Sequence, residues 1–205
     1  MATYLPQYSF TAHITSVHPE YAAALGFSRI SSETNHYTSG LTQEIHSAEY
    51  PYLCLNTWQP ERQKFWFLYH EWDNGDRSYE IKAQHPMFHN HKRSFKSLIV
   101  DAHEYVIPYP YVDEAQGWRI TLDRQCSCPP VSKKPGKILY EVEPELLREA
   151  LVQTVRLNSP NGRDLQVYKR SGEGAAWWAY AVDEGGTTLP LRIDILELGI
   201  AHPLE

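Results

Sequence analysis

Three short aromatic segments decide the expected fold of this chain: Gln63-Lys64-Phe65-Trp66-Phe67, Gln116-Gly117-Trp118-Arg119-Ile120 and Ala175-Ala176-Trp177-Trp178-Ala179. Their central aromatic residues, Phe65, Trp118 and Trp177, follow one another at intervals of about 50 to 60 residues, and self-similarity at a fixed period is typical of repeated structural units. Aromatic side chains fit the half-buried surface of a β-sheet. The spacing therefore predicts three similar β-rich units around one shared core, because no unit of this size buries a core alone.

Turn signals and alternating strands surround these segments. The turns are marked by Asp73-Asn74-Gly75-Asp76, Ser159-Pro160-Asn161-Gly162, Ser171-Gly172-Glu173-Gly174 and Glu184-Gly185-Gly186. Between them, Tyr79, Ile81 and Ala83 alternate with polar neighbours, as in a half-buried strand. Many short strands between turns predict an all-β fold. One short helical insertion is expected near residues 144–156, where a proline and two acids begin an apolar pattern, although the β-branched residues there would also suit a strand.

Two of the segments carry a family resemblance. Gln63-x-Phe65 and Gln116-x-Trp118 resemble the Gln-x-Trp signature of ricin-B-type β-trefoils, while the third segment has Ala175 in place of the glutamine. The segment Leu98-Ile-Val-Asp101 resembles the strand that precedes the sugar site in that family. The resemblance implies a β-trefoil with three pseudo-repeats in a single domain over residues 1–205, with lobes at roughly 8–78, 79–137 and 138–200.

The resemblance also implies a shallow sugar site in the second lobe. Asp101 would accept hydrogen bonds from sugar hydroxyls, and Tyr109 or Tyr111 would stack on the apolar face of a sugar ring. His103 or Gln116 would add a donor. The alternative is that Asp101 is a turn residue and the tyrosines belong to a packed loop.

The expected function is that of a lectin, with glycans or glycoproteins as partners. A protease inhibitor on the same scaffold is the alternative, with the Pro-rich segments Cys126 to Gly136 and Pro108 to Pro110 as candidate inhibitory loops. An enzyme or enzyme subunit with a histidine-containing cleft is the third hypothesis. A homodimer would raise the avidity of weak sugar sites.

Composition excludes other partner classes. The chain has 19 Lys and Arg against 25 Asp and Glu, a net charge of −6, which disfavours nucleic acid. No apolar run reaches the roughly 18 residues that span a bilayer, and the first ten residues lack the features of a secretory signal. The odd count of three cysteines indicates free thiols in a reducing compartment, so we expect a cytoplasmic protein.

Other candidate sites carry weaker signals. His85, His89 and His91 form a cluster whose last two members would project to one side of an extended segment, as metal ligands must, but no carboxylate accompanies them. Cys126 and Cys128 lack the second pair that a structural zinc site needs. No phosphate-binding glycine loop and no nucleophile elbow occurs. We therefore expect no metal and no cofactor, and a binding protein is favoured over an enzyme.

Overall fold

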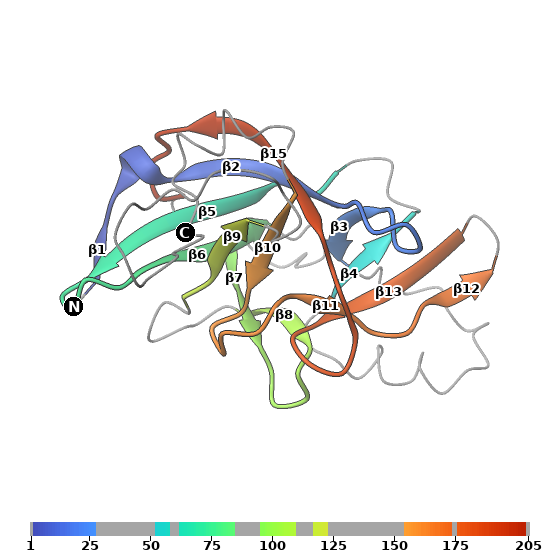
Figure 1. Cartoon of the computed structure of the whole chain (residues 1–205). Coiled ribbons are helices and arrows are strands. Elements are labelled where there is room, and N and C mark those ends of the chain that lie inside the picture. The colour runs from blue at the N-terminus through green and yellow to red at the C-terminus, as the bar shows by residue number, and fades with distance from the viewer. Residues whose placement is uncertain are drawn as a thin grey trace.

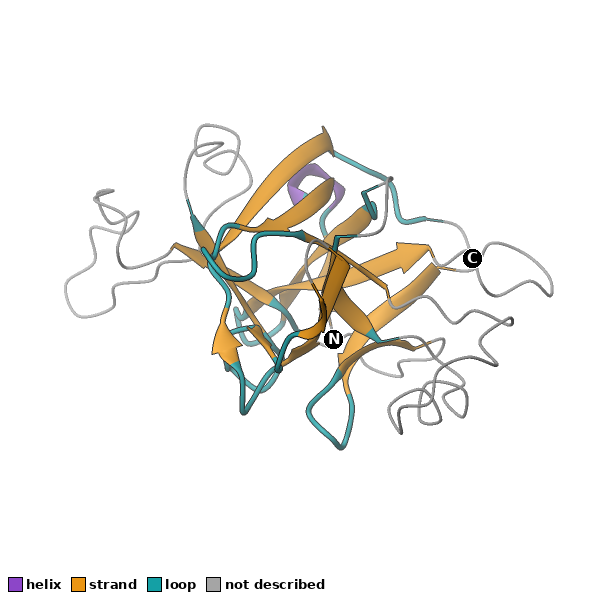
Figure 2. Cartoon of the chain, turned by 90° about the vertical axis from the view of Figure 1, so that its right-hand side faces the viewer, coloured by secondary structure: helices purple, strands orange, loops and turns teal. Residues whose placement is uncertain are grey.

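The computed structural model describes residues 2–27, 52–57, 62–84, 95–109, 117–122, 154–173 and 176–203. Apart from one 3-10 turn, η1 (Pro6–Tyr8), the regular structure of these residues is β. The strands are β1 (Ala2–Tyr4), β2 (Phe10–Ser16), β3 (Ala24–Phe27), β4 (Leu53–Asn56), β5 (Phe65–Trp72), β6 (Arg77–Gln84), β7 (Phe95–Val100), β8 (Val106–Tyr109), β9 (Arg119–Leu122), β10 (Val155–Asn158), β11 (Gln166–Val167), β12 (Ser171–Glu173), β13 (Ala176–Val182), β14 (Thr187–Thr188) and β15 (Leu191–Leu198). They pair antiparallel and form a curled sheet (Figures 1 and 2), which confirms the all-β prediction for these residues.

Six of the strands are joined in a circuit. β2 pairs with β5, β5 with β6, β9 with β10, β10 with β15, and β15 returns to β2. The remaining link, between β6 and β9, is a bridge between Tyr79 and Trp118 with backbone N···O distances of 2.7 and 2.9 Å. The circuit pairs these strands on both sides, which protects them from the edge-to-edge association that open strands invite.

Between the circuit strands the chain makes three excursions. β3 and β4 lie between β2 and β5 in the sequence, β7 and β8 lie between β6 and β9, and the four strands β11 to β14 lie between β10 and β15. Within the excursions, β3 pairs with β4, β7 with β8, and β11 with β13. The excursions also meet, because β13 pairs with β4 and a bridge joins Tyr105, just before β8, to Val182 at the end of β13. Each of the three excursions thus lies between two strands of the circuit.

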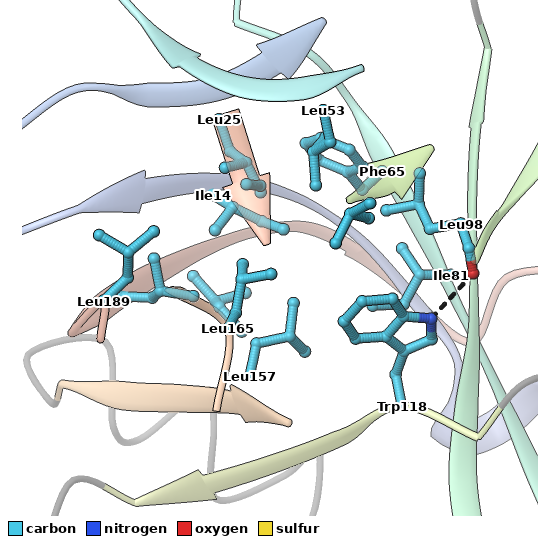
Figure 3. Packing of buried hydrophobic residues seen from close by; sticks show 14 of the residues in the cluster. Ile14, Leu25, Leu53, Phe65, Ile81, Leu98, Trp118, Leu157, Leu165 and Leu189 are labelled. Atoms are coloured by element: carbon cyan, nitrogen blue, oxygen red, sulfur yellow. Dashed lines mark hydrogen bonds between the residues drawn. The ribbon is translucent and has the colours of Figure 1, made fainter. Parts of the chain in front are cut away.

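One hydrophobic core lies inside the curl (Figure 3). Strands from the circuit and from all three excursions contribute to it, with the labelled residues Ile14, Leu25, Leu53, Phe65, Ile81, Leu98, Trp118, Leu157, Leu165 and Leu189. The rings of Phe10 and Phe67 stack in the same core with centroids 4.6 Å apart. Burying a Leu, Ile or Phe side chain stabilises a fold by roughly 1.5 to 3 kcal/mol, so this shared core holds the three stretches of sequence together.

Trp118 is fully buried and also satisfies a polar group in the core. Its Nε1–H donates to the carbonyl of Leu98 with an N···O distance of 2.9 Å (Figure 3). Pro108 stands opposite Leu98 on β8 and has no N–H to donate. The indole therefore fastens β7 to the start of β9 from inside the core.

The three central aromatics do not occupy matching places. Phe65 opens β5 and Trp118 directly precedes β9, and both strands belong to the circuit. Trp177, however, lies on the excursion strand β13, and the residue that opens the third closing strand is the buried Leu191 on β15. At this position an aliphatic side chain fills the core equally well. A search for regularly spaced aromatic residues therefore misses this strand.

The helix predicted near residues 144–156 is wrong for its last residues, which form a strand. Val155 and Arg156 belong to β10, where they pair with Leu122 and Thr121 of β9. The pairing satisfies their backbone groups in the sheet, and the apolar side chains of Val155 and Leu157 point into the core. Residues 144–153 lie outside the described part of the chain.

Candidate binding site

A polar hollow of about 220 Å³ opens at one end of the circuit. Three segments form it: the turn between β5 and β6, the chain entering β9, and the turn that follows β10. Its lining residues are Trp72, Asn74, Asp76, Ser78, Gly117, Arg119, Ser159, Pro160 and Gly162. Segments distant in the sequence meet here because β6 is bridged to β9 and β9 pairs with β10.

The first wall is a turn with preset polar groups. The Gly75 N–H donates to the Trp72 carbonyl at 2.8 Å, and Gly75 has a φ of +81°, which favours glycine. The Asn74 side chain accepts from the Asp76 N–H at 3.0 Å and donates to the Asp76 carboxylate at 2.7 Å. The turn predicted at residues 73–76 is confirmed, and it holds an amide and a carboxylate in fixed positions at the rim.

Trp72 is held by a hydrogen bond to Ser78, and the neighbouring chain needs glycine at position 117 to pass beside this bond. The Trp72 Nε1–H donates to Ser78 Oγ at 3.1 Å. A Cβ built on Gly117 would lie 2.8 Å from the same oxygen, closer than real Cβ contacts come. Gly117 thus lets the chain entering β9 pass close to Ser78 while the indole keeps its hydrogen bond.

Arg119 supplies the positive charge at the hollow. It is exposed on β9, and within the described part of the chain its guanidinium has no hydrogen-bond or ion-pair partner. An unpaired guanidinium offers five donors in a rigid plane that matches carboxylate geometry. The hollow therefore presents a cation from β9 and the carboxylate of Asp76 from the turn before β6.

A buried carboxylate, that of Asp183, stabilises the turn at residues 159–162, which forms the second wall of the hollow. Asp183, at the end of β13, is completely buried, and its Oδ2 accepts from Ser159 Oγ at 2.9 Å and from Asn161 Nδ2 at 2.7 Å. The Gly162 N–H donates to the Ser159 carbonyl at 2.9 Å, with Gly162 at a φ of +76°. The turn predicted at residues 159–162 is confirmed, and Asp183 fixes its shape.

A second acid lies beside Asp183. Glu104 sits in the turn between β7 and β8 at a φ of +68°, and its carbonyl accepts from the Asp183 N–H at 3.0 Å. Nη1 of Arg163 lies 3.2 Å from Glu104 Oε2, 3.8 Å from Asp183 Oδ1 and 2.6 Å from Glu184 Oε2. One guanidinium thus bridges three carboxylates from two excursions of the chain.

The pKa values of Glu104 and Asp183 are shifted in opposite directions. A hydrogen bond to Asp183 is the main cause that raises the pKa of Glu104, followed by partial desolvation. Burial opposes ionisation of Asp183, but hydrogen bonds from Glu104, Asn161 and Ser159 outweigh it and lower its pKa. The raised pKa of Glu104 and the lowered pKa of Asp183 share one cause, which is the closeness of the two carboxyl groups.

A separate ionic cluster surrounds Glu80 on the outer face of β6. Ser97 Oγ donates to Glu80 Oε1 at 2.5 Å, and Lys82 Nζ lies 3.5 Å from the same oxygen. The Nε2 atoms of His70 and His202 lie 3.6 and 3.9 Å from Glu80 Oε2. Burial opposes ionisation of Glu80, but these histidines, Ser97 and Lys82 together lower its pKa well below its usual range.

The sugar site expected around Asp101 is only partly described. Oδ1 of Asp101 accepts from the N–H groups of His103 and Tyr105 at 2.8 and 2.9 Å, which closes the turn between β7 and β8. Tyr109 pairs with Ser97, four residues before Asp101, so the two positions lie about 13 Å apart at the rise of a strand. The structure thus brings Asp101 near the exposed His103 but not near Tyr109.

The remaining predicted residues have these places. Tyr111 and Gln116 lie outside the described residues, as do His85, His89, His91, Cys126 and Cys128. Pro108, expected on an inhibitory loop, is instead buried within β8, where its missing N–H is tolerated opposite Leu98. Cys54 is buried on β4, and burial raises the pKa of its thiol to about 12 against a smaller lowering effect of Asn56.

No group of three or more His, Cys, Asp or Glu side chains in the described ranges is placed to hold a metal ion. No helix in those ranges is long and apolar enough to cross a membrane. Comparison of the chain with protein-family models, curated proteins and solved structures finds no match.

The hollow was not predicted from the sequence, although two of the turns that line it were. Asp73-Asn74-Gly75-Asp76 and Ser159-Pro160-Asn161-Gly162 are both strong turn signals. Nothing in either stretch indicates that the two turns meet beside Arg119. That convergence depends on the pairing of β6, β9 and β10, which local sequence does not encode.

Proposed function

We propose that this chain is a β-trefoil carbohydrate-binding protein that holds one sugar ring in the polar hollow. The trefoil is supported by the circuit of six strands and by the three excursions that interrupt it in a regular order. The resemblance of Gln63-x-Phe65 and Gln116-x-Trp118 to the ricin-B-type signature agrees with it, as does the placement of Phe65 and Trp118 at the two matching circuit strands.

The hollow itself carries the functional part of the proposal. An indole beside fixed amide, carboxylate and guanidinium groups is the combination that a sugar requires, because a sugar ring has both apolar C–H faces and hydroxyl groups. The hollow is smaller than the roughly 300 to 1,000 Å³ of sites for drug-sized ligands, which suits a single ring at the end of a glycan. The dissociation constant of such a shallow site is expected between about 1 mM and 1 μM.

A glycan array with calorimetry on the best ligand tests the proposal. Trp72→Ala should weaken binding at least about tenfold, since it removes the aromatic wall of the hollow. Trp66→Ala is the matched control, because Trp66 lies on β5 but packs against Phe95 outside the hollow. Asp101→Ala separates this hollow from the site expected in the turn between β7 and β8.

The outcomes distinguish the alternatives. Loss of binding in Trp72→Ala with wild-type binding in the other two variants supports the hollow. Loss in Asp101→Ala alone would move the sugar site to the β7–β8 turn. An array without any bound glycan would refute the carbohydrate-binding function.

A further inference from the structure

We infer that the hollow selects an acidic sugar, one that carries a carboxylate as well as hydroxyl groups. This inference rests on the proposed carbohydrate-binding function and adds the chemical class of the ligand. It starts from Arg119, which lines the hollow and differs from the other described arginines in having no partner.

The arginines of the described residues differ in how they are used. Arg62 and Arg192 pair with Asp194 at 2.9 Å, Arg77 lies 4.0 Å from Glu71, and Arg163 is bound by three carboxylates. Arg170 lies over the ring of Trp177 at 4.6 Å, and Arg156 also has interactions. Among the described arginines, Arg119 alone lacks a partner, and it is the one that lines the hollow.

The charge balance of the chain makes this free guanidinium informative. Acidic residues exceed basic ones by 25 to 19, so a carboxylate partner is easily found on the surface. A guanidinium left unpaired at a polar hollow can form a bidentate pair with a ligand carboxylate, which is stronger and more directional than a neutral hydrogen bond.

Asp76 restricts the class of possible ligands further. Asp76 also lines the hollow, and its negative charge would repel a ligand that carries only negative charge. A ligand must therefore offer a carboxylate to Arg119 and donor groups, such as sugar hydroxyls, to Asp76 and Asn74. Uronic acids and sialic acids meet both conditions, whereas neutral sugars offer Arg119 no carboxylate and simple anions offer Asp76 no donor.

Matched sugar pairs test the inference by calorimetry. The probes are methyl glucuronide against methyl glucoside, methyl galacturonide against methyl galactoside, and N-acetylneuraminic acid, all at fixed low ionic strength because a partly exposed ion pair is screened by salt. We expect at least one acid to bind about tenfold more tightly than its neutral partner. Arg119→Gln should abolish that preference.

Arg77→Gln is the matched control, because it removes the same charge from the neighbouring strand β6 outside the hollow. It should leave the preference intact, which separates direct pairing from a general change in charge. Equal binding of acidic and neutral sugars, or an unchanged preference in Arg119→Gln, would overturn the acidic-sugar inference while the carbohydrate-binding function stands. No binding of any probe together with an empty glycan array would overturn both.

Discussion

Replacing Asp183 by alanine should destabilise the protein far more than replacing any exposed acid near it. The Asp183 side chain is fully buried, and it accepts hydrogen bonds from Ser159 and Asn161. Asp183→Ala removes the oxygen that accepts both hydrogen bonds. Asn161 is exposed and can turn to water, but the hydroxyl of Ser159 is buried and would keep no partner for its proton.

The expected magnitude follows from these contacts. A hydrogen bond to a charged group contributes about 1.5 to 3 kcal/mol, and a buried hydroxyl without a partner costs about 1 to 3 kcal/mol. The ion pair with Arg163 adds little, because its N···O distance is long, at 3.8 Å, and the Arg163 side chain is 43% exposed. Because the terms are not additive, we expect Asp183→Ala to lower the free energy of unfolding by about 3 to 5 kcal/mol, as removal of one partner of a buried pair does.

Urea unfolding followed by tryptophan fluorescence measures the effect. Asp183→Asn keeps one oxygen that can accept from Ser159, so we expect it to cost about 1 to 2 kcal/mol. Glu184→Ala removes an acid whose side chain is 56% exposed and should cost less than about 1 kcal/mol. A loss below about 1 kcal/mol in Asp183→Ala would refute the conclusion that this carboxylate holds the wall of the hollow.

Three further predictions concern the core and the ionic cluster. Trp118→Phe leaves the carbonyl of Leu98 without the indole N–H and should lower the free energy of unfolding in urea by about 1 to 3 kcal/mol; an unchanged midpoint would contradict the hydrogen bond. The pKa of Glu80 is lowered from its ordinary 4.5, so its contribution to stability is present above that value and is lost as the pH falls below it. Glu80→Gln should flatten the pH dependence of thermal unfolding in that acidic range, and a curve parallel to that of the wild type would exclude this origin. With the other two cysteines replaced by serine, Cys54 should react with a thiol reagent only when the protein unfolds, because burial raises its pKa to about 12; fast reaction of the native protein would disprove its burial.

The sequence allowed a prediction of the fold class and the turns but not of the site. The alternation of Tyr79, Ile81 and Ala83 reflects which face of a strand meets the core, and it appears in the structure as expected because that signal is local. The turn at residues 73–76 was predictable for the same reason. The third closing strand was not, because Leu191 takes the place of an aromatic and the spacing from Trp118 no longer applies.

The proposed site escaped prediction because it depends on distant pairings. Arg119 follows Trp118 in an aromatic segment, where it shows no more than the polar phase of a strand. The role proposed for Arg119 rests on its lack of a partner among the described residues and on the two turns beside it. Both features depend on the tertiary structure. Asp183 likewise is one of many acids in the sequence, and only its burial behind the Ser159 turn distinguishes it.

The two ends of the described chain lie against each other. The Tyr4 hydroxyl donates to the Ile200 carbonyl at 2.7 Å, and its ring meets that of His202 edge-on with centroids 5.6 Å apart. A short glycine–serine linker can therefore join the ends, and new ends can be opened at the exposed turn between His18 and Tyr21 to give a circular permutant. For the same reason the chain can be inserted as a unit into a surface loop of another protein, because its entry and exit points would occupy neighbouring positions in the host.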